Sequence, residues 1–541
     1  MKEERTEKIK KEISLFLKDK YHLILIGVLI FSLILFLYYF NITKNQPLWW
    51  DEAEYMSIAK NWAFHTFEYK NPQRPILLPF LAFLLYTVGF SDVAIKFLVV
   101  LLPAWLAVLF MYLLVKSMYD KKTAVLAAFI TSVSWIHIFY AMRFMTDSIG
   151  FLAGLLSFYC FWQGYVNNKG RIYIWLIGFF IALSFLSRLT GVLYGAVIIL
   201  FLLITSRFKF LKNKDLWISL LIFFLTISPY LIWSYFTFNN AFAFRAGYSS
   251  EITQGYGLGW NLIQFVYDYP GTVFFILFLI GIATLIPMFL SLDILVLKND
   301  KKFYNDLFMS LSIVFLLAFF IYFIRIAENR WLMLMSIGIF ALSAKGIVLA
   351  YDLVRKNLGK VLAISLVIII LVLGAYVQLT QLDPMIKAKV TSYQPIKDAA
   401  LWMKQNSNPG DAVLSVSYTQ TIFYYESPVY TYSEMNETAF NELIAKTHPR
   451  YIMLSIFEPH HPLWLIQQGQ QEAYQIIALP YFNSSIVYQS NKILSVDIKQ
   501  QTKKGDLIFN YVYPTQQITG VFVYEIVYPT SSISEMYTKS K

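Results

Sequence analysis

The chain has 541 residues, of which 57% are hydrophobic and only 14% are charged, and its formal net charge is +12 at pH 7. This composition predicts a polytopic membrane protein and excludes an ordinary soluble enzyme. The positive charge requires no nucleic-acid partner, because most of the excess falls in short loops, where it sets membrane topology. A single cysteine excludes a disulfide within the chain and a thiolate metal site.

The N-terminal residues 1–20 are rich in Lys and Glu and precede an apolar run at 21–40. No small-residue cleavage site follows this run, so we expect a basic cytoplasmic N-terminus and an uncleaved first span. Ten more runs are long enough to cross a bilayer, at 95–116, 123–141, 147–166, 172–187, 189–206, 216–238, 270–291, 305–325, 330–350 and 360–380. The sequence therefore predicts an all-α polytopic membrane bundle of about 11 spans.

The loop after the first span contains the most informative stretch, Trp49-Trp50-Asp51-Glu52-Ala53-Glu54-Tyr55. Ionised carboxylates are costly near lipid, which favours a chemical role for Asp51 and Glu52. A structural role is an equally good explanation, because Asp or Glu in a first helical turn satisfies free N–H groups and the helix dipole. Apolar residues then follow at helical spacing, which predicts an amphipathic helix lying on the bilayer. Capping and chemistry are both open alternatives at this point.

An apolar run at 76–90 is ambiguous, since it is short, follows Pro75 and contains Pro79. If it crossed the membrane, the basic turn at Lys121 and Lys122 would lie on the same side as the Asp-Glu motif. If it does not, this turn and the other basic turns share the side of the basic N-terminus. The positive-inside rule therefore favours eleven spans, with 76–90 as an interfacial or re-entrant helix.

Ionisable groups of the membrane region gather at the outer ends of the spans and in the outer loops, among them Arg74, Arg143, Asp147, Arg188, Arg245, Arg325, Glu328 and Arg330. Arginine binds phosphate through its planar fork, and a carboxylate can take a proton from an attacking hydroxyl. Together these groups predict displacement at a carbon that bears a phosphate leaving group. Structural roles are the alternative, with snorkelling for arginines at span ends and N-capping for Asp147.

Residues 383–541 change character and predict a separate soluble α/β domain outside the cytoplasm. We expect its helices near 399–404 and 437–446, and its strands at 413–416, 451–454, 505–513 and 519–528. The expected organisation is a cytoplasmic N-terminus at 1–20, a transmembrane catalytic domain at 21–382 whose first outer loop, 41–94, carries interfacial helices, and this tail domain.

The first outer loop, with its Trp-Trp-Asp-Glu-Ala-x-Tyr motif at 49–55 followed by Arg74-Pro75, resembles the GT-C class of glycosyltransferases. The resemblance is greatest to the protein O-mannosyltransferase-like group that includes the aminoarabinose transferase of lipid A. Phe144-Met145-Thr146-Asp147-Ser148 and Glu328-Asn329-Arg330-Trp331-Leu332 are similar to two further stretches of that group. The tail, with Asn408-Pro409-Gly410-Asp411, is similar to the soluble domain that often follows.

This resemblance implies an inverting transferase that moves a sugar from a polyprenyl-phosphate donor to a hydroxyl on an outer-face acceptor, whether protein, lipid or polysaccharide. It implies that Asp51 is the catalytic base, with Glu52 beside it. Arg74 and Arg245 are similar to residues that contact the lipid phosphate. The expected donor-binding set is Tyr55, Arg74, Asp147, Arg245, Glu328 and Arg330.

The aminoarabinose transferase also implies a metal ion, held by an acidic residue before the basic position and by a histidine in a later loop. Here Gln73 stands before Arg74, and the loop at 239–269 contains no histidine. The sequence therefore does not support a divalent metal at this place, and it indicates no other cofactor.

A lipid-linked-sugar transporter or flippase is the main alternative function. Such a protein would more often carry ionisable groups near the membrane midplane and two related halves, whereas this chain concentrates them at one membrane face. A membrane-anchored binding or scaffold protein carried by residues 383–541 is a third class, which would leave the outer arginines unexplained. The sequence therefore favours the transferase without identifying its sugar.

Overall fold

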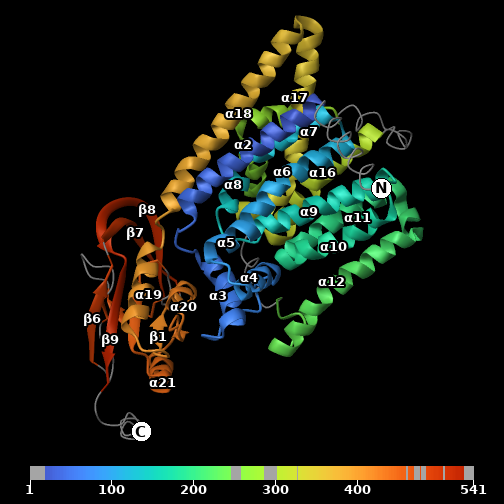
Figure 1. Ribbon diagram of the computed structural model, residues 1–541. Coiled ribbons are helices and arrows are strands. Elements are labelled where there is room, and N and C mark those ends of the chain that lie inside the picture. The colour runs from blue at the N-terminus through green and yellow to red at the C-terminus, as the bar shows by residue number, and fades with distance from the viewer. Residues whose placement is uncertain are drawn as a thin grey trace, which may run out of the picture. The chain divides into compact units, whose positions relative to one another are not determined.

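The computed structural model describes residues 19–244, 258–285, 301–325, 327–457, 461–462, 464–467, 475–476, 483–490, 492–503 and 506–528 (Figure 1). The chain divides into two compact units. The first comprises Met1–Asn45 and Pro72–Lys389, and the second comprises Gln46–Asn71 and Val390–Lys541. The expected organisation assigned the whole first outer loop to the membrane domain, whereas the structure groups residues 46–71 with the tail.

The first unit consists of helices. Its α-helices and the short 3₁₀ and π segments between them are α2 (Lys20–Thr43), α4 (Leu77–Thr87), α5 (Asp92–Lys96), η1 (Phe97–Leu101), α6 (Leu102–Met118), α7 (Lys121–Val133), α8 (Trp135–Ala141), α9 (Asp147–Phe161), η2 (Trp162–Val166), α10 (Arg171–Ser187), η3 (Leu189–Val192), α11 (Leu193–Ser206), η4 (Arg207–Lys212), α12 (Lys214–Phe238), η7 (Trp260–Ile263), α13 (Gln264–Asp268), α14 (Gly271–Ala283), α16 (Lys301–Phe319), η9 (Phe320–Ile324), η10 (Asn329–Met335), α17 (Ser336–Leu358) and α18 (Lys360–Lys389).

Among the described residues, eight helical segments are long and apolar enough to cross a membrane, or ten if each of two bent helix pairs counts as one span. These ten overlap ten of the eleven predicted spans; of the span predicted at 270–291, the structure shows α14 (Gly271–Ala283), and residues 286–291 lie outside the described residues. The eleventh, predicted at 172–187, corresponds to α10, a shorter apolar helix of 17 residues. The prediction of a multi-pass helical membrane protein is therefore confirmed, and the number eleven is approximate.

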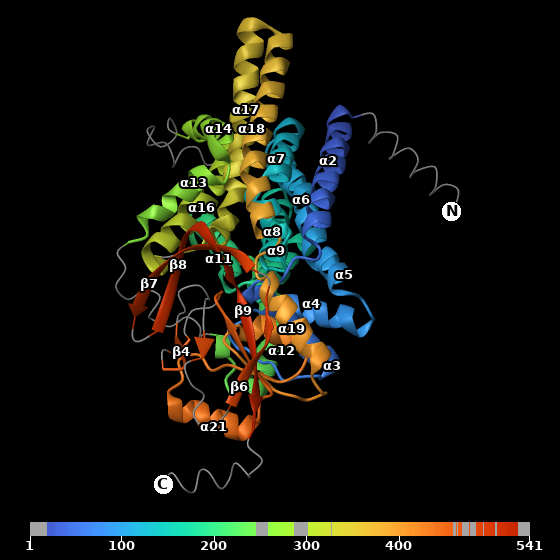
Figure 2. The ribbon, with the colours of Figure 1, turned by 90° about the vertical axis from the view of Figure 1, so that its left-hand side faces the viewer.

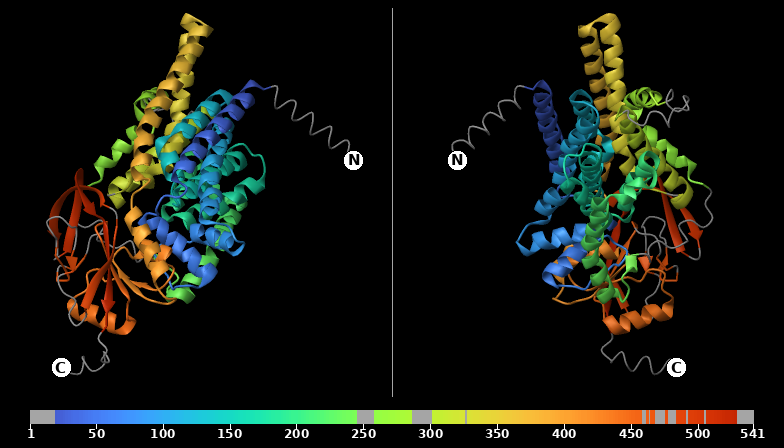
Figure 3. Two further views of the ribbon diagram at one scale, coloured as in Figure 1. Left: turned by 60° about the vertical axis from the view of Figure 1, so that its left-hand side comes forward. Right: turned by 90° about the vertical axis from the view of Figure 1, so that its right-hand side faces the viewer.

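Helix α17 lies at the centre of this unit. Of the apolar 18-residue stretch in η10 and α17, 89% is buried, whereas only 17% of the corresponding stretch in α12 is buried. Helix α17 forms a hairpin with α18, which Figures 1 and 3 show clearly, and Gly359 permits the turn with a φ of 95°. Helix α14 approaches α17 closely at Gly281 and Gly346. A Cβ on Gly346 would lie 1.8 Å from the Leu277 carbonyl oxygen, so only glycine allows this approach.

The ambiguous run at 76–90 contains α4, which has only 11 residues. At 1.5 Å per residue such a helix is about 16 Å long, roughly half the thickness of the hydrocarbon core. Helix α4 is therefore too short to cross the membrane, as the charge distribution predicted.

The basic turns lie together at one end of the helical unit. Lys121 at the start of α7 pairs with Asp19 before α2, and the neighbouring Lys122 lies 2.9 Å from Asp352 near the end of α17. At the same end Lys345 of α17 pairs with Asp306 near the start of α16. The start of α2, the start of α7 and the end of α17 therefore lie at the same end of the unit. With α18 following α17, this arrangement agrees with an odd number of spans.

The second unit is an α/β domain (Figure 2). Its helices are α3 (Trp50–Phe64), α19 (Gln394–Asn406), α20 (Tyr418–Tyr425) and α21 (Glu437–Thr447). Its main sheet has the order β2-β1-β3-β9-β6, formed by β1 (Val413–Ser415), β2 (Val429–Tyr430), β3 (Tyr451–Ser455), β6 (Asn483–Gln489) and β9 (Val521–Val527). Two further pairs are β4 (Ile466–Gln467) with β5 (Gln475–Ile476), and β7 (Lys492–Lys503) with β8 (Asp506–Thr519).

Alternate residues of the central strands enter two apolar cores. Leu414, Ile452 and Phe522 pack on the α21 side, and Val413, Met453 and Val523 pack on the side of α3, α19 and α20. Strand β1 pairs in parallel with β2 and β3, whereas β9 runs antiparallel to β3 and β6. The described domain is therefore a mixed sheet with helices on both faces.

The orientation of the chain is the first testable expectation. With the ten candidate spans and α10 crossing the membrane and α4 remaining on one side, the span count is odd, and the two termini should lie on opposite sides. A reporter that is active only in the cytoplasm should work when fused ahead of Met1 and should be silent when fused after Ser540. Equal activity at both positions would show that the number of spans is even.

Candidate active site

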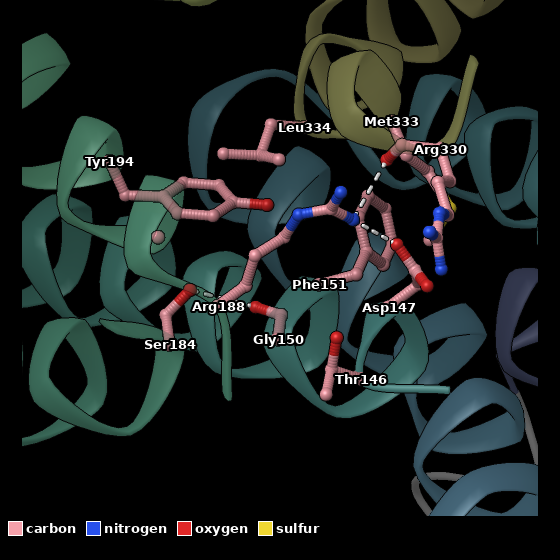
Figure 4. A pocket seen from close by; sticks show the side chains of 11 residues that line it. Thr146, Asp147, Gly150, Phe151, Ser184, Arg188, Tyr194, Arg330, Met333 and Leu334 are labelled. Carbon is pink, nitrogen blue, oxygen red and sulfur yellow. Dashed lines mark hydrogen bonds and ion pairs between the residues drawn. The ribbon is translucent and has the colours of Figure 1, made fainter. Parts of the chain in front are cut away.

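Asp147 and Arg188 form a buried ion pair in the helical unit (Figure 4). Asp147 is the first residue of α9, after the N-cap residue Thr146, and its side chain is 1% exposed. Arg188 follows the end of α10 in an extended conformation, and its Nη1 donates a hydrogen bond to Asp147 Oδ1. The pair therefore joins the start of one helix to the end of the next.

The segment η10 adds a second arginine and a second carboxylate. The carbonyl oxygen of Arg330 accepts a 3.5 Å hydrogen bond from Arg188 Nη1, and the Arg188 guanidinium lies 5.6 Å from the Trp331 ring centre. Arg330 Nε donates to Glu328 Oε2 over 2.6 Å. The structure thus brings together three members of the predicted donor-binding set, Asp147, Glu328 and Arg330.

Hydrogen bonds from other helices fix η10 in place. Asn329 Oδ1 accepts from the Tyr140 hydroxyl at 2.6 Å, and the Asn329 carbonyl oxygen accepts from the Tyr269 hydroxyl. The Tyr269 carbonyl in turn accepts from Gln378 Nε2 of α18 at 3.1 Å. The backbone of the segment that carries Arg330 is therefore held in place by hydrogen bonds from Tyr140 and Tyr269.

A small cavity of about 20 Å³ adjoins the ion pair, lined by Thr146, Asp147, Gly150, Phe151, Ser184, Arg188, Gly191, Tyr194, Arg330, Met333 and Leu334. Figure 4 shows Tyr194 approaching Arg188 from the side opposite Asp147. Within the described residues, Asp147 Oδ2 and the Tyr194 hydroxyl are buried without a hydrogen-bond partner. The cavity has room for about one water molecule and none for a sugar.

The Asp-Glu motif lies in the second unit, at the start of α3. The N-cap residue is Trp49, whose backbone N–H donates to Glu52 Oε2 over 2.8 Å. Glu52 is completely buried, whereas Asp51 is partly exposed in the first helical turn. Tyr55, one turn further, is buried. Glu52 therefore stabilises the start of the helix in the way that N-terminal acidic residues do.

Glu54 has a structural role that the sequence analysis did not assign. Its Oε1 accepts hydrogen bonds from Trp50 Nε1 at 3.2 Å, from the Tyr69 hydroxyl at 3.1 Å and from Asn71 Nδ2 at 3.0 Å. Glu54 thereby holds the loop that follows α3, as far as Asn71, against the helix. The spacing of Trp50 and Glu54, one helical turn, was the available signal for part of this network.

The other predicted residues are placed as follows. Arg74 is partly exposed in the turn before α4, in the first unit, and Arg245 lies outside the described residues. Gln73 is exposed. Across the described ranges no three acidic, histidine or cysteine side chains come together as a metal site.

Arg188 is the residue that the predicted site omitted. It was recognised as a charge at a span end, where snorkelling is common, and was not included in the donor-binding set. A signal was present: two short apolar runs flank Arg188, so the chain must turn there and place the arginine at a helix boundary.

Solved structures with similar folds define the class of this architecture. ArnT from Cupriavidus metallidurans bound to undecaprenyl phosphate has a TM-score of 0.60 at 13% identity, over 80% of this chain and 93% of that one. The Archaeoglobus fulgidus oligosaccharyltransferase AglB, in complex with an inhibitory peptide and a dolichol-phosphate, has a TM-score of 0.58 at 13% identity. The match covers 82% of this chain and 70% of AglB. The mycobacterial arabinofuranosyltransferase AftD has a TM-score of 0.52 at 10% identity, over 94% and 40%. The fold is therefore that of the GT-C glycosyltransferases.

A match of sequence agrees with the fold. Residues 73–233, less than a third of the chain, match the family model described as dolichyl-phosphate-mannose-protein mannosyltransferase. No curated protein matches the chain significantly. The matched segment contains Arg74, Asp147 and Arg188 and ends before Arg330. The predicted resemblance to the GT-C class is thus confirmed.

The Asp147–Arg188 pair gives a prediction about stability. Arg188→Met leaves a carboxylate that is 1% exposed without its cation, and breaking a buried pair in this way costs about 3 kcal/mol. The double variant Asp147→Asn with Arg188→Met removes both charges and should regain part of that loss. Thermal unfolding in detergent measures both, with Arg171→Met, whose side chain is 80% exposed, as the control. A double variant no more stable than Arg188→Met would contradict this assignment.

Proposed function

We propose that the protein is an integral-membrane inverting glycosyltransferase that transfers a sugar from a polyprenyl-phosphate donor to a hydroxyl group at the outer face of the membrane. The observation that carries this proposal is the fold shared with ArnT, whose structure contains undecaprenyl phosphate and of which 93% is covered. The AglB structure contains dolichol-phosphate. Both ligands are polyprenyl phosphates, which supports a donor of this chemical class.

The proposed reaction is a single displacement. The acceptor hydroxyl oxygen attacks the anomeric carbon, the bond from that carbon to the phosphate oxygen breaks, and the polyprenyl phosphate leaves with the electron pair. The acceptor proton passes to one carboxylate, so a single essential base is needed and not the two carboxyl groups of most glycosidases. We assign this role to Asp51, because it is partly exposed in the first turn of α3, whereas the neighbouring Glu52 is completely buried.

Arginines stabilise the charge that develops on the leaving phosphate in this proposal. Arg74 contacts the donor phosphate, and Arg245 has the same proposed role. Arg330 is a further candidate, since its present partner Glu328 has a side chain that is 58% exposed and can exchange for a phosphate. Asp147, neutralised by Arg188, then adds no uncompensated negative charge near Arg330.

The acceptor and the membrane face are also part of the proposal. The family description names a dolichyl-phosphate-linked mannose and a protein acceptor, and the AglB structure contains a peptide. These names support a protein acceptor, while the arabinofuranosyltransferase AftD keeps both a hexose and a pentose within the proposal. The positive-inside rule places the basic end of the helices in the cytoplasm, and the catalytic face and the tail on the other side.

Asp51→Asn tests the catalytic base. Asparagine keeps the size of the side chain and caps helices as well as aspartate, but it cannot accept the proton, so transfer should fall by about 10²–10⁴-fold. Sugar transfer from a polyprenyl-phosphate donor and thermal stability should be measured together. Asp92→Asn is the matched control, since Asp92 is also an acidic residue in a first helical turn. A fully active Asp51→Asn variant would remove the proposed base.

Arg74 is expected to bind the donor phosphate. Arg74→Lys keeps the charge but loses the fork and should weaken transfer, while Arg74→Ala should cost about 2–3 kcal/mol in kcat/KM if a charge-assisted hydrogen bond is lost. Arg171→Ala, at an exposed arginine of the basic end, should transfer at the parental rate. Parental kcat/KM in Arg74→Ala would exclude Arg74 from the phosphate site.

A further inference from the structure

Helix α3, which carries Asp51, is held at its start by residues of the tail that are 343 and 376 positions away in the sequence. The backbone N–H of Leu48 donates to the Tyr424 hydroxyl at 2.9 Å, and Trp49 Nε1 donates to Ser392 Oγ at 3.3 Å. Leu48 and Trp49 immediately precede α3, and Asp51 lies in its first turn. The start of the helix is therefore fixed to the tail by both a backbone and a side-chain hydrogen bond.

The other half of α3 is held by an ion pair. Lys60 Nζ lies 2.7 Å from Glu426 Oε1 and 4.0 Å from the centre of the Phe423 ring, and its side chain is only 11% exposed. Glu426 ends α20 in the left-handed conformation, with a φ of 57°, and its second oxygen lies 2.5 Å from Lys404. Burial raises the pKa of the Glu426 carboxyl, but Lys60 and Lys404 outweigh burial and hold it below the ordinary value.

Apolar packing joins these two attachments. Ile58 lies in one core cluster with Ile396 and Met403 of α19 and with Ile422 of α20. Residues Glu52 to Lys60 of α3 are all buried, which differs from a helix that rests one face on a bilayer. Figure 1 shows α3 beside α20 within this unit. The helix is thus part of the core of the α/β domain.

We propose that α20, through Tyr424 and Glu426, is the element that positions Asp51, so that the tail domain is part of the catalytic apparatus of this enzyme. The inference rests on the proposed function for its catalytic consequence, and on the contacts of α3 for its structural part. Tyr424 and Glu426 are positioning residues: they contact the segment that carries the base and have no contact with substrate in this proposal.

The physical reason is the stiffness of a helix and the geometry of proton transfer. Asp51 and Lys60 are separated by about 14 Å along one helix. Attachments at Leu48 and Lys60 therefore fix both the direction of the helix axis and the position of the first turn along it. A general base must lie within hydrogen-bond reach of the proton it removes, and a misplacement of about 1 Å can cost about 10²-fold in rate. Loss of either attachment should therefore lower kcat more than it changes donor KM.

The experiment uses the full chain and two variants that remove single polar groups, Tyr424→Phe and Glu426→Gln. Hydrogen exchange at the amides of residues 48–53 measures whether the start of α3 is released, and this readout does not depend on activity. Donor kcat and KM measure the consequence. Asp411→Asn is the matched control, because the Asp411 side chain pairs with Arg450 at 3.0 Å and accepts from the Asn408 amide, and both of these partners lie outside α3.

We expect faster exchange at 48–53 and at least a tenfold lower kcat in both variants, with donor KM within about twofold of the parental value. Lys60→Met should also lower kcat, and the double variant should lose less than the product of the two single losses, since both changes remove the Lys60–Glu426 ion pair. Asp411→Asn should leave exchange at 48–53 and kcat unchanged.

Two results would overturn the inference. Unchanged exchange at 48–53 in Tyr424→Phe and Glu426→Gln would show that α20 does not hold the start of α3. Faster exchange with parental kcat would show that the position of α3 does not limit turnover. If the parental chain transfers no sugar from any polyprenyl-phosphate donor, the proposed function fails, and hydrogen exchange alone then decides whether α20 holds α3.

Discussion

An ionised side chain that loses contact with water must gain a partner of opposite charge, and this constraint determines where the charges of the helical unit lie. At one end, Asp147 with 1% side-chain exposure pairs with Arg188. At the other, Asp306 with 6% side-chain exposure pairs with Lys345. In both cases the two partners come from different helices, so the same contacts that neutralise charge also fix the packing of the bundle. Arg330 of the proposed donor site depends on this arrangement, because its carbonyl oxygen accepts a hydrogen bond from Arg188.

The three acidic residues at the start of α3 differ in burial, and we propose that they differ in role as well. Glu52 accepts the Trp49 amide at the helix start, and Glu54 accepts three hydrogen bonds that hold the loop as far as Asn71. Both are buried. Asp51 is partly exposed between them, which suits a group that must receive a proton from an incoming hydroxyl. The two explanations that the sequence left open, capping and chemistry, thus correspond to different residues in our proposal.

Hydropathy and charge predicted the helical part of the fold well, because a membrane-spanning helix must be about 20 apolar residues long wherever it occurs. The positive-inside rule favoured a run at 76–90 that does not cross the membrane, and the 11 residues of α4 agree with it because they are too few to span. Contacts between distant segments could not be predicted in this way. Lys60 and Glu426 are 366 residues apart, and no periodicity connects them. The contact of Arg188 with Asp147, 41 residues away, was equally invisible in the sequence, where an arginine at a span end is explained by snorkelling.

The central claim is a single displacement from a lipid-phosphate donor, and the stereochemistry of the product tests it most directly. Purified protein in lipid nanodiscs should be given a polyprenyl-phosphate-linked sugar or the corresponding nucleotide-linked sugar, and the anomeric configuration of the product should be determined by NMR. Our proposal predicts product only from the lipid-phosphate donor, with the configuration at the anomeric carbon inverted. Retained configuration, or transfer from the nucleotide sugar alone, would contradict it.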